Sequence, residues 1–215
     1  NSVTEGDVVG CLNSLVENGQ LYRFSEFYSI QPSENNVLRR MLGNQEAERW
    51  LPVAQHKARF ISRFPFVRAV MASGSLSKEY MDENSDLDFF IVTASSRLWI
   101  SRTLLVLYKR IFLNNSHKHF CVNYFVDEDH LEIEEKNLFT ATELATVIPL
   151  YGAGYYEQLI KKNRPWLISF FPNFVSRPFG DVPVNDSPLF KRLCEKILNA
   201  TGGNALNLFF MKLTL

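Results

Sequence analysis

The chain has 215 residues, enough for one domain with a sizeable hydrophobic core. Its hydrophobic content of 46% is ordinary for a globular protein and excludes a disordered one. Lys and Arg balance Asp and Glu at 23 each, so no bulk charge points to nucleic acid or to an anionic membrane. Three separated cysteines, no signal peptide and no apolar run of about 18 residues predict a cytoplasmic protein without a disulfide framework or a membrane span.

The first segment, residues 1–34, predicts a helix followed by a short hairpin. Thr4 and Asp7 form a helix-start pattern, and Asn18-Gly19 a stop. A helix followed by a hairpin resembles half of a winged helix, so we expect a small winged-helix-like N-terminal piece. Residues 1–35 have a formal charge of −4, which repels phosphates. Packing or dimerisation is therefore favoured over nucleic-acid binding, which is possible but not indicated by the charge.

The central segment, residues 35–162, alternates helix and strand patterns. A helical pattern runs from 35 to 63, and a break or kink at Pro52 is expected to split it into two pieces. The apolar periodicity then predicts strands at Val67–Ser73, Asp86–Thr93 and Phe120–Val126, with a helix at Leu98–Phe112 between the last two.

The remainder of the chain is less regular. We expect an edge strand at Leu131–Ile133, a helix from Thr140 to Pro149, and another over Tyr151–Lys162. Prolines and weak periodicity in 163–186 predict a long surface connection. A final helix pair should begin at Ser187-Pro188, with Ser187 as the cap, and divide at Gly202-Gly203.

Two short motifs indicate a phosphate and metal site. Gly74-Ser75 follows an apolar strand, and such a turn can bring N–H groups close to an anion. Asp86 and Asp88 stand one residue apart, so on a strand they share a face with Phe90 while Leu87 and Phe89 face the other way. Mg²⁺ prefers oxygen ligands and often takes one or two carboxylates together with phosphates. We therefore expect Asp86 and Asp88 to bind the metal.

The two motifs together indicate chemistry on a nucleotide. Ser75 and the Gly74 turn are expected to hold phosphates, and Lys78 to add positive charge. Transfer of a nucleotidyl group needs an attacking hydroxyl, an α-phosphate and a pyrophosphate leaving group in line. The prediction is Mg²⁺-dependent transfer of a nucleoside monophosphate from a nucleoside triphosphate (NTP) to an unknown hydroxyl acceptor.

Gly74-Ser75, followed after ten residues by Asp86-Leu87-Asp88, resembles the signature of the DNA polymerase beta-type nucleotidyltransferase superfamily. The wider run 73–93 is similar to a bacterial branch of uncharacterised nucleotidyltransferase-domain proteins. The resemblance covers about residues 60–150. It implies Mg²⁺ dependence, an NTP donor and an α/β (α+β) fold, with a nucleotidyltransferase-type mixed sheet flanked by helices. The expected organisation is thus a winged-helix-like piece at 1–34, a nucleotidyltransferase core at 35–162, and a linker with C-terminal helices at 163–215.

The sequence departs from this family at its third acid. The family places a further carboxylate on a following strand, where this chain has Asn123. Asn123 can ligate through its carbonyl but cannot act as a base. Asp127 is the alternative on that strand.

Other interpretations remain open at this point. Without the third acid, the chain could be a catalytically impaired nucleotide-binding or interaction module. A DNA-binding regulator is disfavoured by the acidic N-terminus, and a glycosyltransferase using Asp-x-Asp normally starts with a longer sheet. Glu143 is expected on a helix surface.

Overall fold

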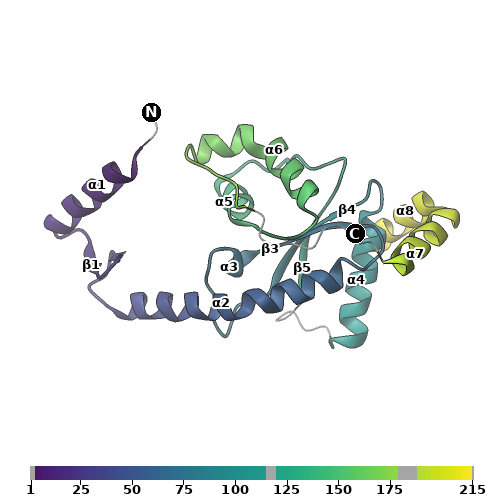
Figure 1. Ribbon diagram of the computed structural model, residues 1–215, viewed down its shortest axis with the longest axis horizontal. Coiled ribbons are helices and arrows are strands. Elements are labelled where there is room, and N and C mark those ends of the chain that lie inside the picture. Colours follow the sequence, from purple (N-terminus) through teal and green to yellow (C-terminus); the bar gives the residue numbers. More distant parts are fainter. Residues whose placement is uncertain (1–2, 115–119, 179–187, 215) are drawn as a thin grey trace.

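The computed structural model describes residues 3–114, 120–178 and 188–214, which form a mixed α+β structure (Figure 1). The expected α+β class is confirmed. Its centre is a four-stranded sheet in the order β5-β4-β3-β6. The bounds of these strands are β3 Val67–Ser73, β4 Asp88–Thr93, β5 Cys121–Asp127 and β6 Ile148–Tyr151.

The sheet is mixed in direction. β3 is antiparallel to both β4 and β6, whereas β4 and β5 are parallel. The helix α4 (Leu98–Phe112) connects the two parallel strands, as a crossover requires. The register of β4 with β5 shifts by one residue at Asn123, because Phe89 pairs with Val122 but Phe90 pairs with Tyr124.

Helices cover both faces of the sheet, and side chains of β4 alternate between the two layers. Leu87 and Phe89 pack with Leu105 of α4 and with α2 (Asn35–Ile61). Phe90 packs on the opposite face, with α5 (Leu138–Thr146) and α6 (Ala153–Phe170). Figure 1 shows α5 and α6 on one side of the sheet and α2 and α4 on the other. The predicted alternation of faces is confirmed.

The expected break at Pro52 is wrong, because α2 runs without interruption through that residue (Figure 1). A proline inside a helix removes one backbone hydrogen bond. Packing compensates for this loss: Ala47, Ala54 and Ala58 are buried in the core along the same helix. Burial of this apolar face keeps α2 continuous where local propensity alone predicts a break.

The N-terminal segment has the expected local elements. α1 (Glu5–Glu17) starts at Thr4, whose side chain and that of Asp7 form a reciprocal capping box. The strands β1 (Tyr22–Phe24) and β2 (Phe27–Ser29) form an antiparallel pair. α1 contains no buried residue and lies beyond the end of α2 that is far from the sheet (Figure 1). The winged-helix-like assignment and the boundaries at 34, 35, 162 and 163 stay predictions.

Two expectations between residues 131 and 151 are wrong. Leu131–Ile133 is not a strand; the segment is irregular and is fastened by Asn163, which bonds to its backbone at both ends. The helix expected up to Pro149 ends at Thr146, and residues 148–151 form β6 instead. β6 is an edge strand, where the missing N–H of Pro149 can be tolerated.

The C-terminal third is more helical than expected. α6 continues through Pro165 to Phe170, with Leu167 buried, so the first part of the expected surface connection is helix. The final helix pair is confirmed as α7 (Leu189–Ala200) and α8 (Gly203–Thr214), divided at Gly202. The predicted cap Ser187 lies outside the described residues.

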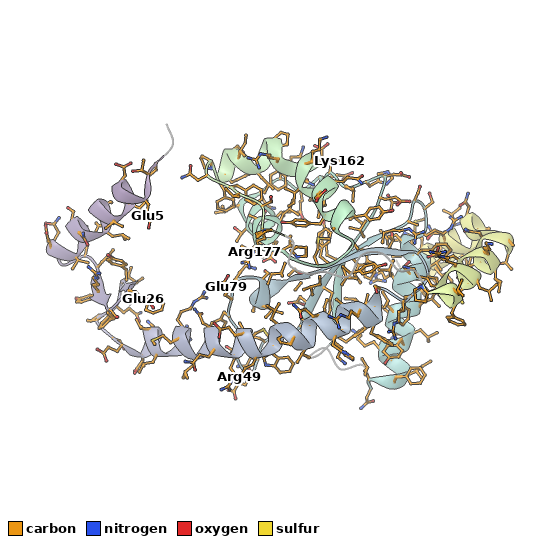
Figure 2. The ribbon with its side chains drawn as sticks, in the orientation of Figure 1. Glu5, Glu26, Arg49, Glu79, Lys162 and Arg177 are labelled. Atoms are coloured by element: carbon orange, nitrogen blue, oxygen red, sulfur yellow. The ribbon has the colours of Figure 1, made fainter. Side chains whose placement is uncertain are left out.

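The segment after α6 returns across the end of the sheet that carries Gly74. Arg177 donates a hydrogen bond to the Ser77 carbonyl at 2.9 Å and reaches Glu79 at 3.3 Å. Figure 2 shows Arg177 above Glu79, with the two side chains approaching from different elements. This contact fixes the chain beyond the turn that follows β3.

Candidate functional site

The turn at Gly74 adopts a backbone conformation suited to glycine. Gly74 has φ of +64° and begins the single helical turn α3 (Gly74–Ser77) directly after β3. The Ser77 hydroxyl donates to the Gly74 carbonyl at 2.8 Å and lies 3.2 Å from the Thr146 hydroxyl. The half-buried Ser75 accepts hydrogen bonds at its carbonyl from the N–H groups of Lys78 and Tyr80. These bonds hold the turn in one shape.

Asp88 lies directly against this turn. It pairs with Ser73 across the two strands, so the acid and the turn meet at one end of the sheet. A Cβ atom on residue 74 would lie 2.1 Å from Oδ2 of Asp88, far inside van der Waals contact. Only glycine therefore allows this close approach, and the expected convergence of Gly74 with Asp88 is present in the structure.

Asp86 is close to Asp88 but is not on the strand. β4 begins at Asp88, so the expected strand start at Asp86 is wrong by two residues. Asp86 is half-buried at the end of a loop that is anchored to α2, where the Met81 N–H donates to the Gly43 carbonyl at 3.0 Å. The ring of Tyr80 packs so closely on Gly43 that a Cβ there would lie 2.2 Å from it. The anchored loop thus presents Asp86 beside the strand.

The electrostatics at Asp88 disfavour its negative charge. Burial raises the pKa of the Asp88 carboxyl, and the charges of Asp86 and Glu143 raise it further. A hydrogen bond from the Cys121 thiol and the charge of Lys78 act in the opposite direction. Burial and Asp88 in turn raise the pKa of the Cys121 thiol to about 11. The carboxylates of Asp86, Asp88 and Glu143 outnumber the Lys78 ammonium that acts on Asp88, and a bound cation would relieve this imbalance.

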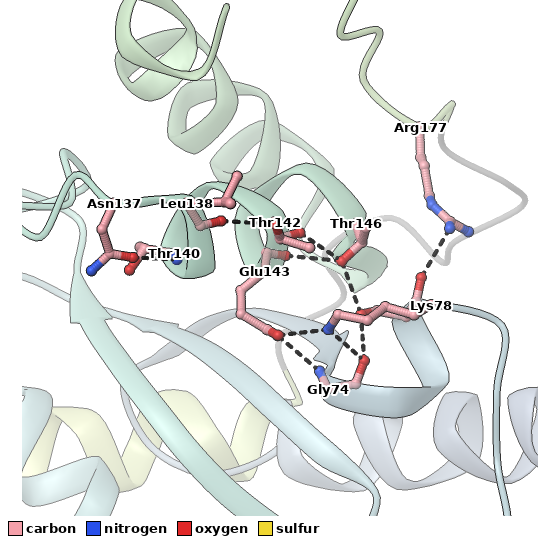
Figure 3. A network of polar contacts seen from close by, with 10 residues as sticks. Gly74, Lys78, Asn137, Leu138, Thr140, Thr142, Glu143, Thr146 and Arg177 are labelled. Carbon is pink, nitrogen blue, oxygen red and sulfur yellow. Dashed lines mark hydrogen bonds and ion pairs between the residues drawn. The ribbon is translucent and has the colours of Figure 1, made fainter. Parts of the chain in front are cut away.

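Glu143 lies on a helix, α5, as expected, but it is half-buried and contacts the Gly74 turn. Its carboxylate accepts a hydrogen bond from the Gly74 amide at 3.2 Å and pairs with the Lys78 ammonium at 2.6 Å. Lys78 also donates to the Gly74 carbonyl at 3.0 Å. Figure 3 shows Glu143 extending from α5 to the Gly74 amide and to the Lys78 ammonium. The two donors predicted to hold phosphate are held here by a carboxylate.

The third-acid position is not filled by a carboxylate of β5. The backbone of Asn123 is the extra residue at the register shift, and its side chain lies outside the described part of the structure. Asp127 pairs with Thr93, five residues from Asp88 along β4, or about 17 Å at 3.3 Å per residue. Its carboxylate accepts from the backbone N–H of His130 at 3.1 Å. The alternative that Asp127 completes the site is therefore wrong.

A cavity of about 290 Å³ opens beside Asp88 and Gly74. One part of its lining is acidic, from Asp88, Glu135 and Glu143. The other part is aromatic: Phe90 and Tyr124 stack with ring centroids 4.9 Å apart, and Phe139 is largely exposed nearby. The cavity thus places carboxylates next to a flat aromatic wall.

The donor set fits a magnesium ion held by few protein ligands. Among the described residues no group of three His, Cys, Asp or Glu side chains is arranged to hold a metal. Asp86 and Asp88 supply two carboxylates within electrostatic range of each other. Mg²⁺ commonly takes one or two carboxylates and completes its sphere with phosphates and water. Oxygen donors in a negatively charged, half-buried place match that requirement.

A scan of protein-family models and searches among curated proteins and solved structures return no match to this chain. Across the described residues, no helix combines the length and apolarity needed to cross a bilayer. The functional assignment therefore depends on the motif and on the geometry around Asp88.

Proposed function

We propose that this chain is a Mg²⁺-dependent nucleotidyltransferase that moves a nucleoside monophosphate from an NTP to a hydroxyl acceptor. The carrying observation is the contact between the Gly74 turn and Asp88, in which a Cβ would fall 2.1 Å from the carboxylate. This contact places the backbone of the Gly74 turn, which is to hold a phosphate, next to the pair of carboxylates. The nucleotidyltransferase-type arrangement of the mixed sheet is part of the same proposal.

The residues in and around the cavity divide the roles in this proposal. Asp86 and Asp88 hold the metal, which supplies positive charge against the triphosphate. The Gly74 amide, Ser75 and Lys78 hold phosphate oxygens once these displace the Glu143 carboxylate. The stacked pair of Phe90 and Tyr124 receives the nucleobase.

The reaction forms a bond between the acceptor oxygen and the α-phosphorus and breaks the bond to the β-phosphate oxygen. The proton of the acceptor hydroxyl passes to solvent water, and pyrophosphate leaves. The protein's contribution is positioning: the anchored loop fixes Asp86, and β4 fixes Asp88.

A second candidate is a nucleotide-binding module without catalysis. It is favoured by the absence of a β5 carboxylate from the site, within the part of the chain that the structure describes. Asp127 lies at the far end of the sheet, and Tyr124 stands opposite Phe90. Such a module would bind NTP and Mg²⁺ and release no pyrophosphate.

The test is incubation with Mg²⁺ and each NTP labelled at the γ-phosphate, with release of labelled pyrophosphate measured for wild type, Asp86→Asn and Asp88→Asn. Glu157→Gln is the control, since it removes one exposed carboxylate on α6, away from the cavity. Release by wild type and by the control, lost in both Asp variants, supports the transferase. NTP binding without release supports the module, and the absence of both contradicts the two proposals.

A further inference from the structure

A second polar cavity of about 330 Å³ lies at the opposite end of the sheet from Asp88. It is lined by the start of β3 at Val67 and Arg68, by Tyr151 and Tyr155, and by Lys191, Arg192 and Glu195 of α7 (Leu189–Ala200). Arg68 lies five residues before Ser73, the partner of Asp88, so the two cavities are separated by about 17 Å along β3. It is therefore distinct from the candidate active site.

Lys191 is the most unusual residue in this cavity. Only 1% of it is exposed, and its ammonium donates to the carbonyls of Ser62 at 2.9 Å and Val67 at 2.6 Å. The third hydrogen of the ammonium has no oxygen or nitrogen acceptor among the described residues, and Nζ lies 5.9 Å from the ring centroid of Tyr151, a cation–π contact. No carboxylate forms an ion pair with Lys191 among the described residues. A buried charge of this kind is costly unless it has a counter-ion.

The carboxylate closest in sequence, Glu195, is already engaged. It pairs with Arg68 at 2.9 Å and accepts the backbone N–H of Phe66 at 2.7 Å. Glu128 also acts on Arg68, but it does not line the cavity, and its carboxylate accepts the backbone N–H of Ser95 at 3.0 Å. These acids therefore compensate Arg68 and leave Lys191 with less than a full counter-charge.

Arg192 adds a further positive charge at the same place. It is exposed, lines the cavity beside Lys191, and forms no ion pair within the described ranges. Both cations stand in the first turn of α7, where the helix dipole is itself positive and the first turn holds no acidic residue. Helices usually carry acids there, so this turn is arranged for an external anion.

We propose that the cavity between Arg68, Lys191 and Arg192 binds the phosphate group of a small phosphorylated molecule. Lys191 donates its remaining hydrogen, Arg192 supplies a guanidinium from the rim, and Tyr151 and Tyr155 form the wall beside the rest of the ligand. A volume of about 330 Å³ leaves room beyond the phosphate itself. The proposal does not depend on the nucleotidyltransferase assignment.

The test is a titration of the isotopically labelled full chain with ribose 5-phosphate and, separately, with inorganic phosphate, followed by the backbone amide signals of α7. We expect saturable shifts at Lys191 and Arg192 in the millimolar range. Arg192→Gln should weaken binding about tenfold, as the loss of one charge-assisted bond implies. Lys196→Gln, a matched exposed charge on the same helix that lies outside the cavity, should leave the affinity unchanged.

Tighter binding of ribose 5-phosphate assigns the site to a phosphorylated molecule, and equal affinities assign it to free phosphate; both support the anion site. Shifts confined to Gly74–Lys78, or equal weakening in Arg192→Gln and Lys196→Gln, overturn it. Because Arg192 is exposed and has no structural partner among the described residues, its variant is expected to fold. Asp88→Asn should not change these shifts, which separates this site from the first cavity.

Discussion

Glu143 and Lys78 form an ion pair of 2.6 Å across the mouth of the Gly74 turn, with their side chains about one-quarter and one-third exposed. Because Glu143 also accepts from the Gly74 amide, it occupies two groups that a phosphate of the proposed substrate needs. The pair therefore connects α5 to the turn, and under the proposed function it competes with the triphosphate.

Glu143→Gln should strengthen NTP binding several-fold. The substitution keeps the size of the side chain but removes a negative charge that repels phosphate and holds Lys78. Calorimetric titration with each NTP in the presence of Mg²⁺ measures the change, with Glu157→Gln as the control. Weaker binding in Glu143→Gln would show instead that Glu143 positions Lys78 for the substrate.

Gly74→Ala should destabilise the fold by about 1–3 kcal/mol and reduce NTP binding by more than tenfold. The added Cβ meets Asp88, and φ of +64° is strained for alanine. Gly154→Ala is the matched control: it has open space in α6 and should stabilise by about 0.5–1 kcal/mol. Urea unfolding measures both, and equal effects would contradict the contact.

Tyr124→Ala should weaken binding of NTP by about 2–12-fold while leaving inorganic triphosphate unaffected. The ring of Tyr124 stacks on Phe90 in the cavity, and aromatic stacking is worth about 0.5–1.5 kcal/mol. Competition of the two ligands for the same protein measures the difference. Equal weakening for both ligands would place the base elsewhere.

Asn163→Ala should cost about 3 kcal/mol of unfolding free energy. The fully buried Asn163 amide makes four hydrogen bonds, which tie α6 and Trp166 to the irregular segment at Leu131 and Ile133. Its loss leaves buried backbone groups unsatisfied. Gln158→Ala, exposed on the same helix, should change stability by less than about 0.5 kcal/mol. An Asn163→Ala cost below about 1 kcal/mol would contradict this role.

Lys191→Met should alter how stability depends on alkaline pH. Burial lowers the pKa of Lys191 from 10.5 to about 8, while the charge of Glu195 acts against this and that of Arg68 with it. Between these values the unfolded chain binds more protons than the folded one, so Lys191 makes wild type more stable as pH rises from 8 towards 10.5. Wild type should gain up to roughly 3 kcal/mol relative to Lys191→Met over that range. Urea unfolding at several pH values measures this. A difference in unfolding free energy between the two proteins that stays constant with pH would contradict the prediction.

The strands and the Gly74 and Asp88 motifs could be predicted because their signals are local. The continuous apolar run at 89–92 predicts a strand that is buried on both faces, and the structure has both. The predictions that relied on Pro52, Pro149 and Pro165 to end or break an element are wrong. Packing or an edge position compensates for the missing N–H in each element. Such compensation comes from other parts of the fold and has no local signal.

Glu143 could not be assigned to the site from its own helix. On α5 it is a charged residue between Thr142 and Leu144, and its partners are 69 and 65 residues away. A half-buried carboxylate near Asp88 is a consequence of how α5 packs on the sheet. The register shift at Asn123 could not be predicted either, because a single extra residue leaves the apolar pattern of β5 intact.

The central claim is that Asp88 and the Gly74 turn bind Mg²⁺ and NTP together, and calorimetry tests it most directly. Each NTP is titrated into wild type and Asp88→Asn with Mg²⁺ present, and again with Mg²⁺ removed by chelation. The account predicts saturable binding to wild type that falls by more than tenfold on chelation or in Asp88→Asn. Binding that is equal with and without Mg²⁺, and equal in the two proteins, would contradict it.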